Sequence, residues 1–252
     1  MKLDQFLEKR KLTLSSSTED ACKEGIERMR ISKDPHHSDR HVYGLLDELD
    51  MFLDNEESKI DFSVLIPAIC WHDVWKSTRK QSTNIPFFVF EQLYDGHGSV
   101  KLFKKYAKES SLTKDHAENI TYCIAKHSQI SHWVNMQNVF LLRTVEAKIM
   151  RDIDELDRWS LACFNHLKQS YLGDGKKLNP KLIPVAKWWF FNIIQKAKDT
   201  RFYFNYSKNE FLKRKKLFVK EIYKVWDDRY TYVDNTKANK KYLEDSRMQK
   251  HL

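Results

Sequence analysis

Apolar residues recur along this chain three and four positions apart, which is the spacing of one face of an α-helix. The clearest stripe consists of His41, Leu45, Leu49 and Phe52. A second stripe within 137–159 consists of Val139, Leu142, Val145, Ile149, Ile153 and Leu156. A nearly unbroken apolar run over 62–71 is long enough for a central buried helix and leads directly into His72 and Asp73. The pattern predicts a protein built from helices.

Capping and turn residues divide this pattern into elements. Ser and Thr residues at 15–18 are typical of a helix start, and Thr113 is a predicted cap for a helix over 114–127. Asp34-Pro35 separates two helices, because proline has no amide proton to donate. Polar segments at 54–58 and 77–87 are predicted loops, the second of them lying over the site. Another predicted helix begins near His41. The remaining predicted helices cover 22–31, 96–106 (opened by Gly96-His97-Gly98-Ser99), 137–159, 185–197 and 204–226.

The composition agrees with a helical protein. Only 6 glycines and 5 prolines occur among 252 residues, whereas a β-sandwich or a doubly wound α/β fold needs many more turns. Neither GxGxxG nor GxxxxGK[ST] is present, so a glycine-rich phosphate loop is excluded. The sequence predicts an all-α fold with one domain over 1–226. Its core is expected at about 36–160, its C-terminal helices at about 180–226 and a basic, flexible tail at 227–252.

Charge and cysteine usage narrow the setting. The formal net charge is +9, and residues 201–252 hold 14 Lys and Arg against 7 Asp and Glu, a balance of +7. A basic C-terminus can attract nucleic acid or another polyanion, although a solvated helix face is the simpler interpretation.

The 4 cysteines are widely spaced, no apolar run is long enough to span a membrane, and the N-terminus lacks an apolar signal region. We expect a cytoplasmic protein without a membrane partner. The cluster Trp188-Trp189-Phe190-Phe191 is interpreted as core or as a homodimer contact, ahead of a base-stacking platform.

Imidazoles and carboxylates occur at predicted helix ends, where they could meet around a divalent ion. His72 and Asp73 follow an apolar run, so their polar groups need water or a partner, and an ion would serve both. The candidates in chain order are His41, His72, Asp73, His97, His127 and Asp154.

The order His…His-Asp…Asp resembles the HD superfamily of metal-dependent phosphohydrolases. Trp71-His-Asp-Val-Trp-Lys76 is similar to its HD-x-x-K motif, and Asp154-Glu-Leu is similar to its closing A-D-x-L element. The resemblance covers about residues 36–160 and extends loosely to about 222. It implies an HD-domain helical bundle with additional C-terminal helices. It also implies a metal site of His41, His72, Asp73 and Asp154.

The resemblance implies roles for further residues. His97 and His127 match extra histidines of subfamilies with an enlarged site, so they are candidates for a second metal, for phosphate binding or for acid catalysis. Lys76 is expected to neutralise phosphate charge, with Arg79 and Lys126 as further substrate-binding candidates. His37 and Asp152 are expected behind the ligands, and Asp152 competes with Asp154 for the last ligand position. As alternatives, each histidine could be a plain core or surface residue.

The implied activity is hydrolysis of a nucleotide or another small phosphoester by water that the metal activates. Mixed nitrogen and oxygen ligands suit Mn, Fe, Co, Ni or Zn, with Mg as a further option. Ser128 stands where some two-metal relatives have another histidine, and Trp75 replaces a small residue before the motif lysine. We therefore expect one tightly held ion. The alternatives are an inactive HD-fold scaffold or nucleic-acid-binding protein and, less favoured, a di-iron oxygenase.

Overall fold

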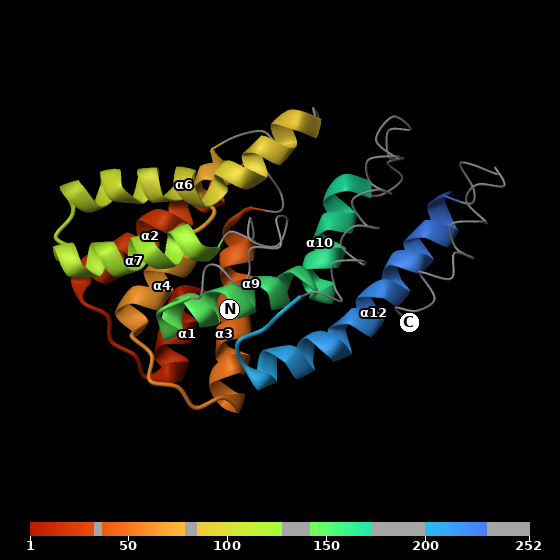
Figure 1. Cartoon of the computed structure of the whole chain (residues 1–252), viewed down its shortest axis with the longest axis horizontal. Coiled ribbons are helices and arrows are strands. Elements are labelled where there is room, and N and C mark those ends of the chain that lie inside the picture. The colour runs from red at the N-terminus through yellow and green to blue at the C-terminus, as the bar shows by residue number, and fades with distance from the viewer. Residues whose placement is uncertain (33–36, 79–84, 128–141, 173–199, 231–252) are drawn as a thin grey trace. The chain divides into compact units, whose positions relative to one another are not determined.

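The computed structural model of the chain describes residues 1–32, 37–78, 85–127, 142–172 and 200–230. These residues form helices joined by turns and contain no strand, so the predicted all-α fold is confirmed for the described part of the chain (Figure 1). The helices are α1 (Leu3–Arg10), α2 (Ser16–Arg30), α3 (Asp39–Asn55), α4 (Phe62–Trp71), α5 (Val74–Ser77), α6 (Ile85–Glu109), α7 (Lys114–His127), α9 (Val145–Arg158), α10 (Leu161–Leu172) and α12 (Asn205–Tyr230). They group into two compact units, Met1–Asp157 and Arg158–Leu252.

The first unit is organised around α4. Every residue of α4 from Val64 to Trp71 is buried, and the helix packs against α2 on one side and α7 on another, with α6 covering α7. The Trp71 indole nitrogen donates a hydrogen bond to the Ala21 carbonyl oxygen at 2.7 Å, and its ring meets Phe103 edge-on with centroids 5.3 Å apart. A single side chain thus ties α2, α4 and α6 together immediately before His72.

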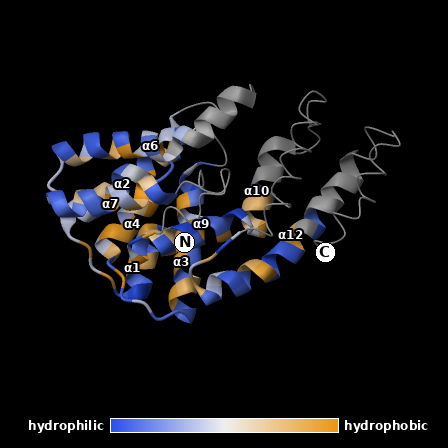
Figure 2. Ribbon diagram, viewed as in Figure 1, coloured by the Kyte–Doolittle hydropathy of each residue, from blue (hydrophilic) through white to orange (hydrophobic). Residues whose placement is uncertain are grey.

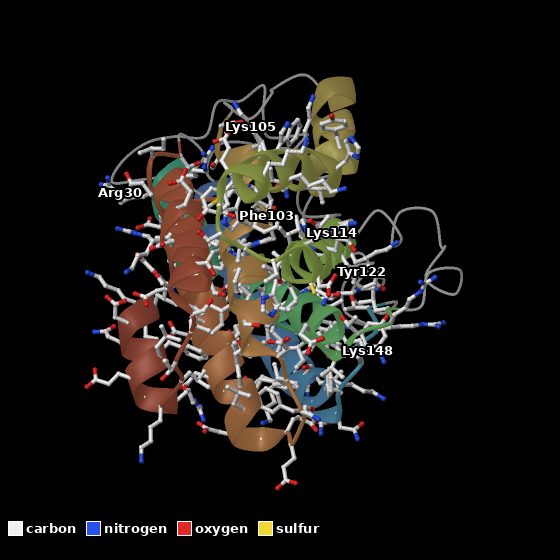
Figure 3. All side chains as sticks on the ribbon, turned by 90° about the vertical axis from the view of Figure 1, so that its left-hand side faces the viewer. Arg30, Phe103, Lys105, Lys114, Tyr122 and Lys148 are labelled. Atoms are coloured by element: carbon white, nitrogen blue, oxygen red, sulfur yellow. The ribbon has the colours of Figure 1, made fainter. Side chains whose placement is uncertain are left out.

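The helices of this unit have apolar inner faces and charged outer faces (Figure 2). On α6, Phe103 is fully buried while Lys105 is exposed (Figure 3). The predicted caps form as expected. Ser15 accepts a hydrogen bond from the Thr18 amide, and Thr113 accepts one from the His116 amide. Among the described residues, no helix has the length and apolar character that a bilayer crossing requires.

Two predicted boundaries are wrong. The helix expected to open at Gly96 begins at Ile85 and continues through Gly96 and Gly98, so the predicted loop over 77–87 reaches at most to 84. A Cβ atom on Gly98 would lie 2.3 Å from the Trp75 ring, so this glycine lets the indole pack against an unbroken helix. The helix expected from 137 begins at Val145, because residues 142–144 form a non-helical lead-in.

The second unit has its own aromatic core. Trp159 contacts Phe211 and Phe218 of α12, with ring centroids 5.2 and 4.8 Å apart, and Phe218 also contacts Phe164 of α10 at 5.3 Å. The predicted helix over 204–226 is therefore present and extends to Tyr230. The predicted helix over 185–197, with its tryptophan cluster, and the tail from 231 lie outside the described residues.

Candidate metal centre

Three helices of the first unit bring the predicted ligands together. His41 lies in the first turn of α3, His72 and Asp73 follow the last residue of α4, and Asp154 lies in α9. All four side chains are buried, His72 completely. This burial follows from the sequence pattern, because each residue ends or interrupts an apolar helix face that packs into the unit. His41, His72 and Asp73 are also the only group of three or more His, Cys, Asp or Glu residues with metal-ligand spacing among the described residues.

The distances between these side chains match those between ligands of one ion. The His41 and His72 Nε2 atoms are 3.1 Å apart, and the Asp73 Oδ2 atom is 3.2 Å from His72 Nε2 and 3.6 Å from His41 Nε2. Ligands about 2.1 Å from an ion are roughly 3.0–3.5 Å apart at octahedral or tetrahedral angles. His41, His72 and Asp73 can therefore hold a metal ion together. Asp154 Oδ1 lies 3.4 Å from His41 Nε2 but is not part of this group with mutual ligand spacing.

The hydrogen bonds of the His41 and His72 imidazoles give a second argument that an ion can bind between them. His72 Nδ1 donates to the Ile69 carbonyl oxygen at 2.7 Å, and His41 Nδ1 donates to the Asp157 carboxylate at 2.8 Å. Each neutral ring then has its proton on Nδ1 and its lone pair on Nε2. The two Nε2 lone pairs face each other at 3.1 Å, an arrangement that requires a proton or a metal ion between them.

A proton is strongly held at His41 when no ion is bound. Burial alone would lower the pKa of this imidazole, but hydrogen bonds to Asp154 and Asp157 outweigh it and raise the pKa to about 10. The carboxylates therefore stabilise a positive charge at this position. A metal ion would supply that charge and displace the proton.

Asp73 presents its two oxygens to different partners. Oδ2 faces His41 and His72, whereas Oδ1 lies 3.2 Å from the Lys76 ammonium and 3.4 Å from His127 Nε2. Oδ1 is buried and has no hydrogen bond of good geometry among the described residues. Burial alone would raise the pKa of Asp73, but Lys76 and the surrounding histidines lower it well below its usual value. Asp73 is thus a carboxylate with coordinating capacity on both oxygens.

His127 and His37 complete the surroundings of Asp73. His127 Nδ1 donates to the Ile124 carbonyl oxygen at 2.6 Å, so its Nε2 atom is the one that faces Asp73. His72 is oriented in the same way, by a hydrogen bond from Nδ1 to the carbonyl oxygen three residues earlier. His37 is buried, and its Nε2 atom is 3.7 Å from Asp73 Oδ2. It therefore lies beside the cluster although it precedes α3, which begins at Asp39.

The other sequence candidates are placed differently. His97, a candidate for a second metal or for phosphate binding, is exposed on α6 and its ring contacts Tyr94, with centroids 5.1 Å apart. Lys126 is half-buried in α7, and Arg79 lies outside the described residues. Asp152 is fully buried in α9, two positions before Asp154 and therefore about 200° around the helix from it.

Two residues of the site escaped the sequence reasoning. Asp157 holds His41 Nδ1 at 2.8 Å, and Gly44 gives Asp157 its space, since a Cβ atom there would lie 2.8 Å from Asp157 Oδ1. Asp157 follows Asp154 by three residues, so both carboxylates occupy one face of α9. That spacing was the available signal. The role of Gly44 depends on how closely α3 and α9 approach, which no sequence pattern reveals.

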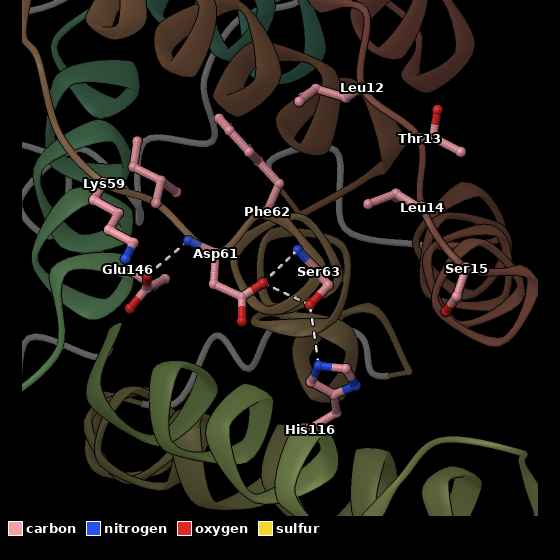
Figure 4. Close-up of a pocket in the computed structure, with 11 residues that line it drawn as sticks. Leu12, Thr13, Leu14, Ser15, Lys59, Asp61, Phe62, Ser63, His116 and Glu146 are labelled. Atoms are coloured by element: carbon pink, nitrogen blue, oxygen red, sulfur yellow. Dashed lines mark hydrogen bonds between the residues drawn. The ribbon is translucent and has the colours of Figure 1, made fainter.

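A separate groove of about 620 Å³ lies at the other end of α4 from His72 (Figure 4). Ser63 Oγ donates to Asp61 Oδ1 at 2.6 Å and lies 3.2 Å from His116 Nε2. Asp61 also accepts a hydrogen bond from the Ser63 amide at 3.0 Å, as an N-cap does. The hydroxyl proton is directed to Asp61 and not to an imidazole base, so this group caps α4 and is not arranged as a nucleophile.

No protein-family model, curated protein or solved structure matches this chain. The resemblance to the HD superfamily therefore rests on the motifs alone. The capacity to bind a metal ion rests on the geometry of His41, His72 and Asp73, which is independent of any relative.

Proposed function

We propose that this protein is a metal-dependent phosphohydrolase of the HD type, acting on a nucleotide or another small phosphoester. The observation that carries the proposal is the pair of Nε2 lone pairs facing each other at 3.1 Å beside the Asp73 and Asp154 carboxylates. Nitrogen and carboxylate ligands in this number fit Mn, Fe, Co, Ni or Zn, and Mg less well. A cation next to the cluster, Lys76, fits an anionic substrate.

The residues divide into two groups around Asp73. His41, His72, Asp73 Oδ2 and Asp154 would hold the ion, which when bound acidifies a coordinated water and polarises a phosphoryl oxygen. Lys76 lies on the Oδ1 side with 15% of its side chain exposed, so its ammonium can meet a phosphate oxygen arriving from solvent. His127 faces the same side and can carry a proton at Nε2, where a leaving oxygen would need one.

Metal analysis followed by a substrate panel tests this function. We expect about one equivalent of a transition metal after purification. We also expect hydrolysis of at least one of p-nitrophenyl phosphate, bis(p-nitrophenyl) phosphate and nucleoside mono-, di- or triphosphates. Two irons with oxygen consumption would support an oxygenase instead. Metal-free protein that gains no activity with any of the six ions would support a scaffold role and contradict the proposal.

Replacing His127 by Ala should lower turnover without emptying the site. The His127 Nε2 atom lies 3.4 Å from Asp73 Oδ1, on the side where Lys76 lies, and its ring packs edge-on against His72 with centroids 4.9 Å apart. We expect a fall in kcat of about 10²-fold, the range for losing a positioned acid or base, with the metal content unchanged. His97→Ala is the matched control, because His97 is an exposed histidine. Loss of the metal in His127→Ala would instead make His127 a ligand.

We also propose nucleic acid as a partner of the second unit. α12 packs its Phe211 and Phe218 inward, and its outer face presents the exposed Lys208, Lys216 and Lys220. These lysines are 12 residues apart from first to last, which is about 18 Å of helix. Because these lysines span this length, they can each meet a different phosphate of one strand.

Reversing these three lysines to Glu should weaken binding of a single-stranded oligonucleotide at least 10-fold and flatten its salt dependence. The matched control reverses the exposed Lys101, Lys104 and Lys108 of α6, which makes the same change in net charge. Fluorescence anisotropy across a salt series measures both. An equal loss in the two variants would show that only net charge matters.

A further inference from the structure

One imidazole of the cluster is held through both of its nitrogens by a single helix. Asp154 Oδ1 lies 3.4 Å from His41 Nε2, and Asp157 Oδ2 lies 2.8 Å from His41 Nδ1. The two aspartates are three residues apart on α9 and therefore lie one above the other on the same face. All three side chains are buried, so water does not compete for the Nδ1 bond.

The place of Asp157 is set by an absent side chain on the facing helix. Gly44 follows His41 by three residues on α3, and a Cβ atom there would lie 2.8 Å from Asp157 Oδ1 and 3.2 Å from its Cγ. Real Cβ atoms do not approach a carboxylate oxygen that closely. Any residue other than glycine would therefore push the Asp157 carboxylate away from the position from which it reaches His41.

We propose that Asp157, seated against Gly44, is a positioning residue that fixes His41 as the Nδ1–H tautomer and so directs its Nε2 lone pair at the metal ion. This inference rests on the proposed metal binding and extends it to two residues that touch no ion. His72 obtains the same orientation from the Ile69 carbonyl of its own chain segment. His41 obtains it from a carboxylate on another helix, Asp157 of α9.

The role of Asp157 should appear in the affinity of the cluster for a metal ion. With Asp157 in place, the Nδ1 proton is bound and the carboxylate makes Nε2 a stronger electron donor. Without it, the proton can move to Nε2, where it points at His72 Nε2 and occupies the direction that an ion needs. Outer partners of this kind change metal affinity by about 10–100-fold when removed.

The test measures zinc affinity of Asp157→Asn and Asp157→Ala by competition with a chelator. The Asn side chain has nearly the same size, and its carbonyl oxygen can still accept the Nδ1 proton without the charge. We expect Ala to bind zinc about 10–100-fold more weakly than the unchanged protein and Asn to fall between the two. Nitrogen NMR of the zinc-loaded proteins should show a hydrogen-bonded Nδ1 proton on His41 in the unchanged protein, and in zinc-loaded Asp157→Ala this proton should exchange rapidly with water.

Gly44→Ala should weaken zinc binding in the same range, although residue 44 contacts no ligand atom directly. Asp50→Asn is the matched control, since it removes the charge of another buried carboxylate of the first unit, one that pairs with Lys9 and Arg10 of α1; its zinc affinity should stay within about twofold of the unchanged protein. If the unchanged protein binds no metal, the proposed function fails. If it binds zinc tightly and Asp157→Asn, Asp157→Ala and Gly44→Ala bind equally well, only the positioning role is overturned. Should the Ala variants not fold, the zinc affinity of the Asn variant still decides.

Discussion

Replacing Asp73 by Ala should remove the metal and the activity together while the helices remain. Asp73 faces both groups of the site. Its Oδ2 atom faces His41 and His72, and its Oδ1 atom faces Lys76 and His127. We expect bound metal to fall below detection and turnover to fall more than about 100-fold, beyond the cost of losing an outer partner. Metal analysis and far-ultraviolet circular dichroism of the same sample measure the two effects.

The chain offers a matched control for this variant. Asp50 is another buried aspartate of the first unit, held at its carboxylate by Lys9 and Arg10 at the surface of α1. Asp50→Ala also deletes a paired buried carboxylate, so it should lower the free energy of unfolding, yet it should retain the metal. Full metal content in Asp73→Ala would show that the ligand assignment is wrong.

The stability of the metal-free protein should decrease at alkaline pH. The folded-state pKa of His41 is about 10, against 6.5 for an ordinary histidine, because Asp154 and Asp157 hold its charged form against the cost of burial. A raised pKa contributes stability that is complete below the unfolded value and is lost as the pH rises through the folded value. The free energy of unfolding should thus fall between about pH 7 and pH 10, by a few kcal/mol at most, at about 1.36 kcal/mol per unit.

Urea unfolding of chelator-treated protein at several pH values in this window provides the measurement. In His41→Gln the titrating group is gone, so its free energy of unfolding should change little over the same range. The zinc-loaded protein should also lack this dependence, because the ion replaces the proton. A decline of equal size in His41→Gln would assign the effect to other groups.

The sequence predicted those parts of the fold that depend on local patterns. The apolar run before His72 became the buried α4, and Thr113 with the stripe after it predicted α7 at its observed bounds. The continuous α6 was missed, because glycines at 96 and 98 normally favour a break. Here Gly98 is retained in a helix, since the Trp75 ring fills the space a side chain would take.

The residues of the site that depend on local patterns could likewise be predicted from the sequence. His41, His72 and Asp73 could be selected because each lies where an apolar helix face meets a residue that needs a partner, and the structure brings them together. Asp157 and Gly44 could not, since their roles arise from the separation of α3 and α9. His97 is the converse case. Its match to extra histidines of the HD superfamily made it a candidate for the site, whereas the helical register places it on the exposed face of α6.

The ligands come from parts of the chain that are far apart, and a bound ion would join them as a cross-link does. Positions 72, 73 and 154 would each be tied to position 41, closing loops of the polypeptide. In the unfolded chain such a tie lowers the entropy, and more so for a longer loop. In the folded protein the same tie holds α3 and α9 to the end of α4, so removing the ion should loosen these helices before the tryptophan-centred packing of α2, α4 and α6 is lost. Limited proteolysis with and without chelator should then cut first between 142 and 158.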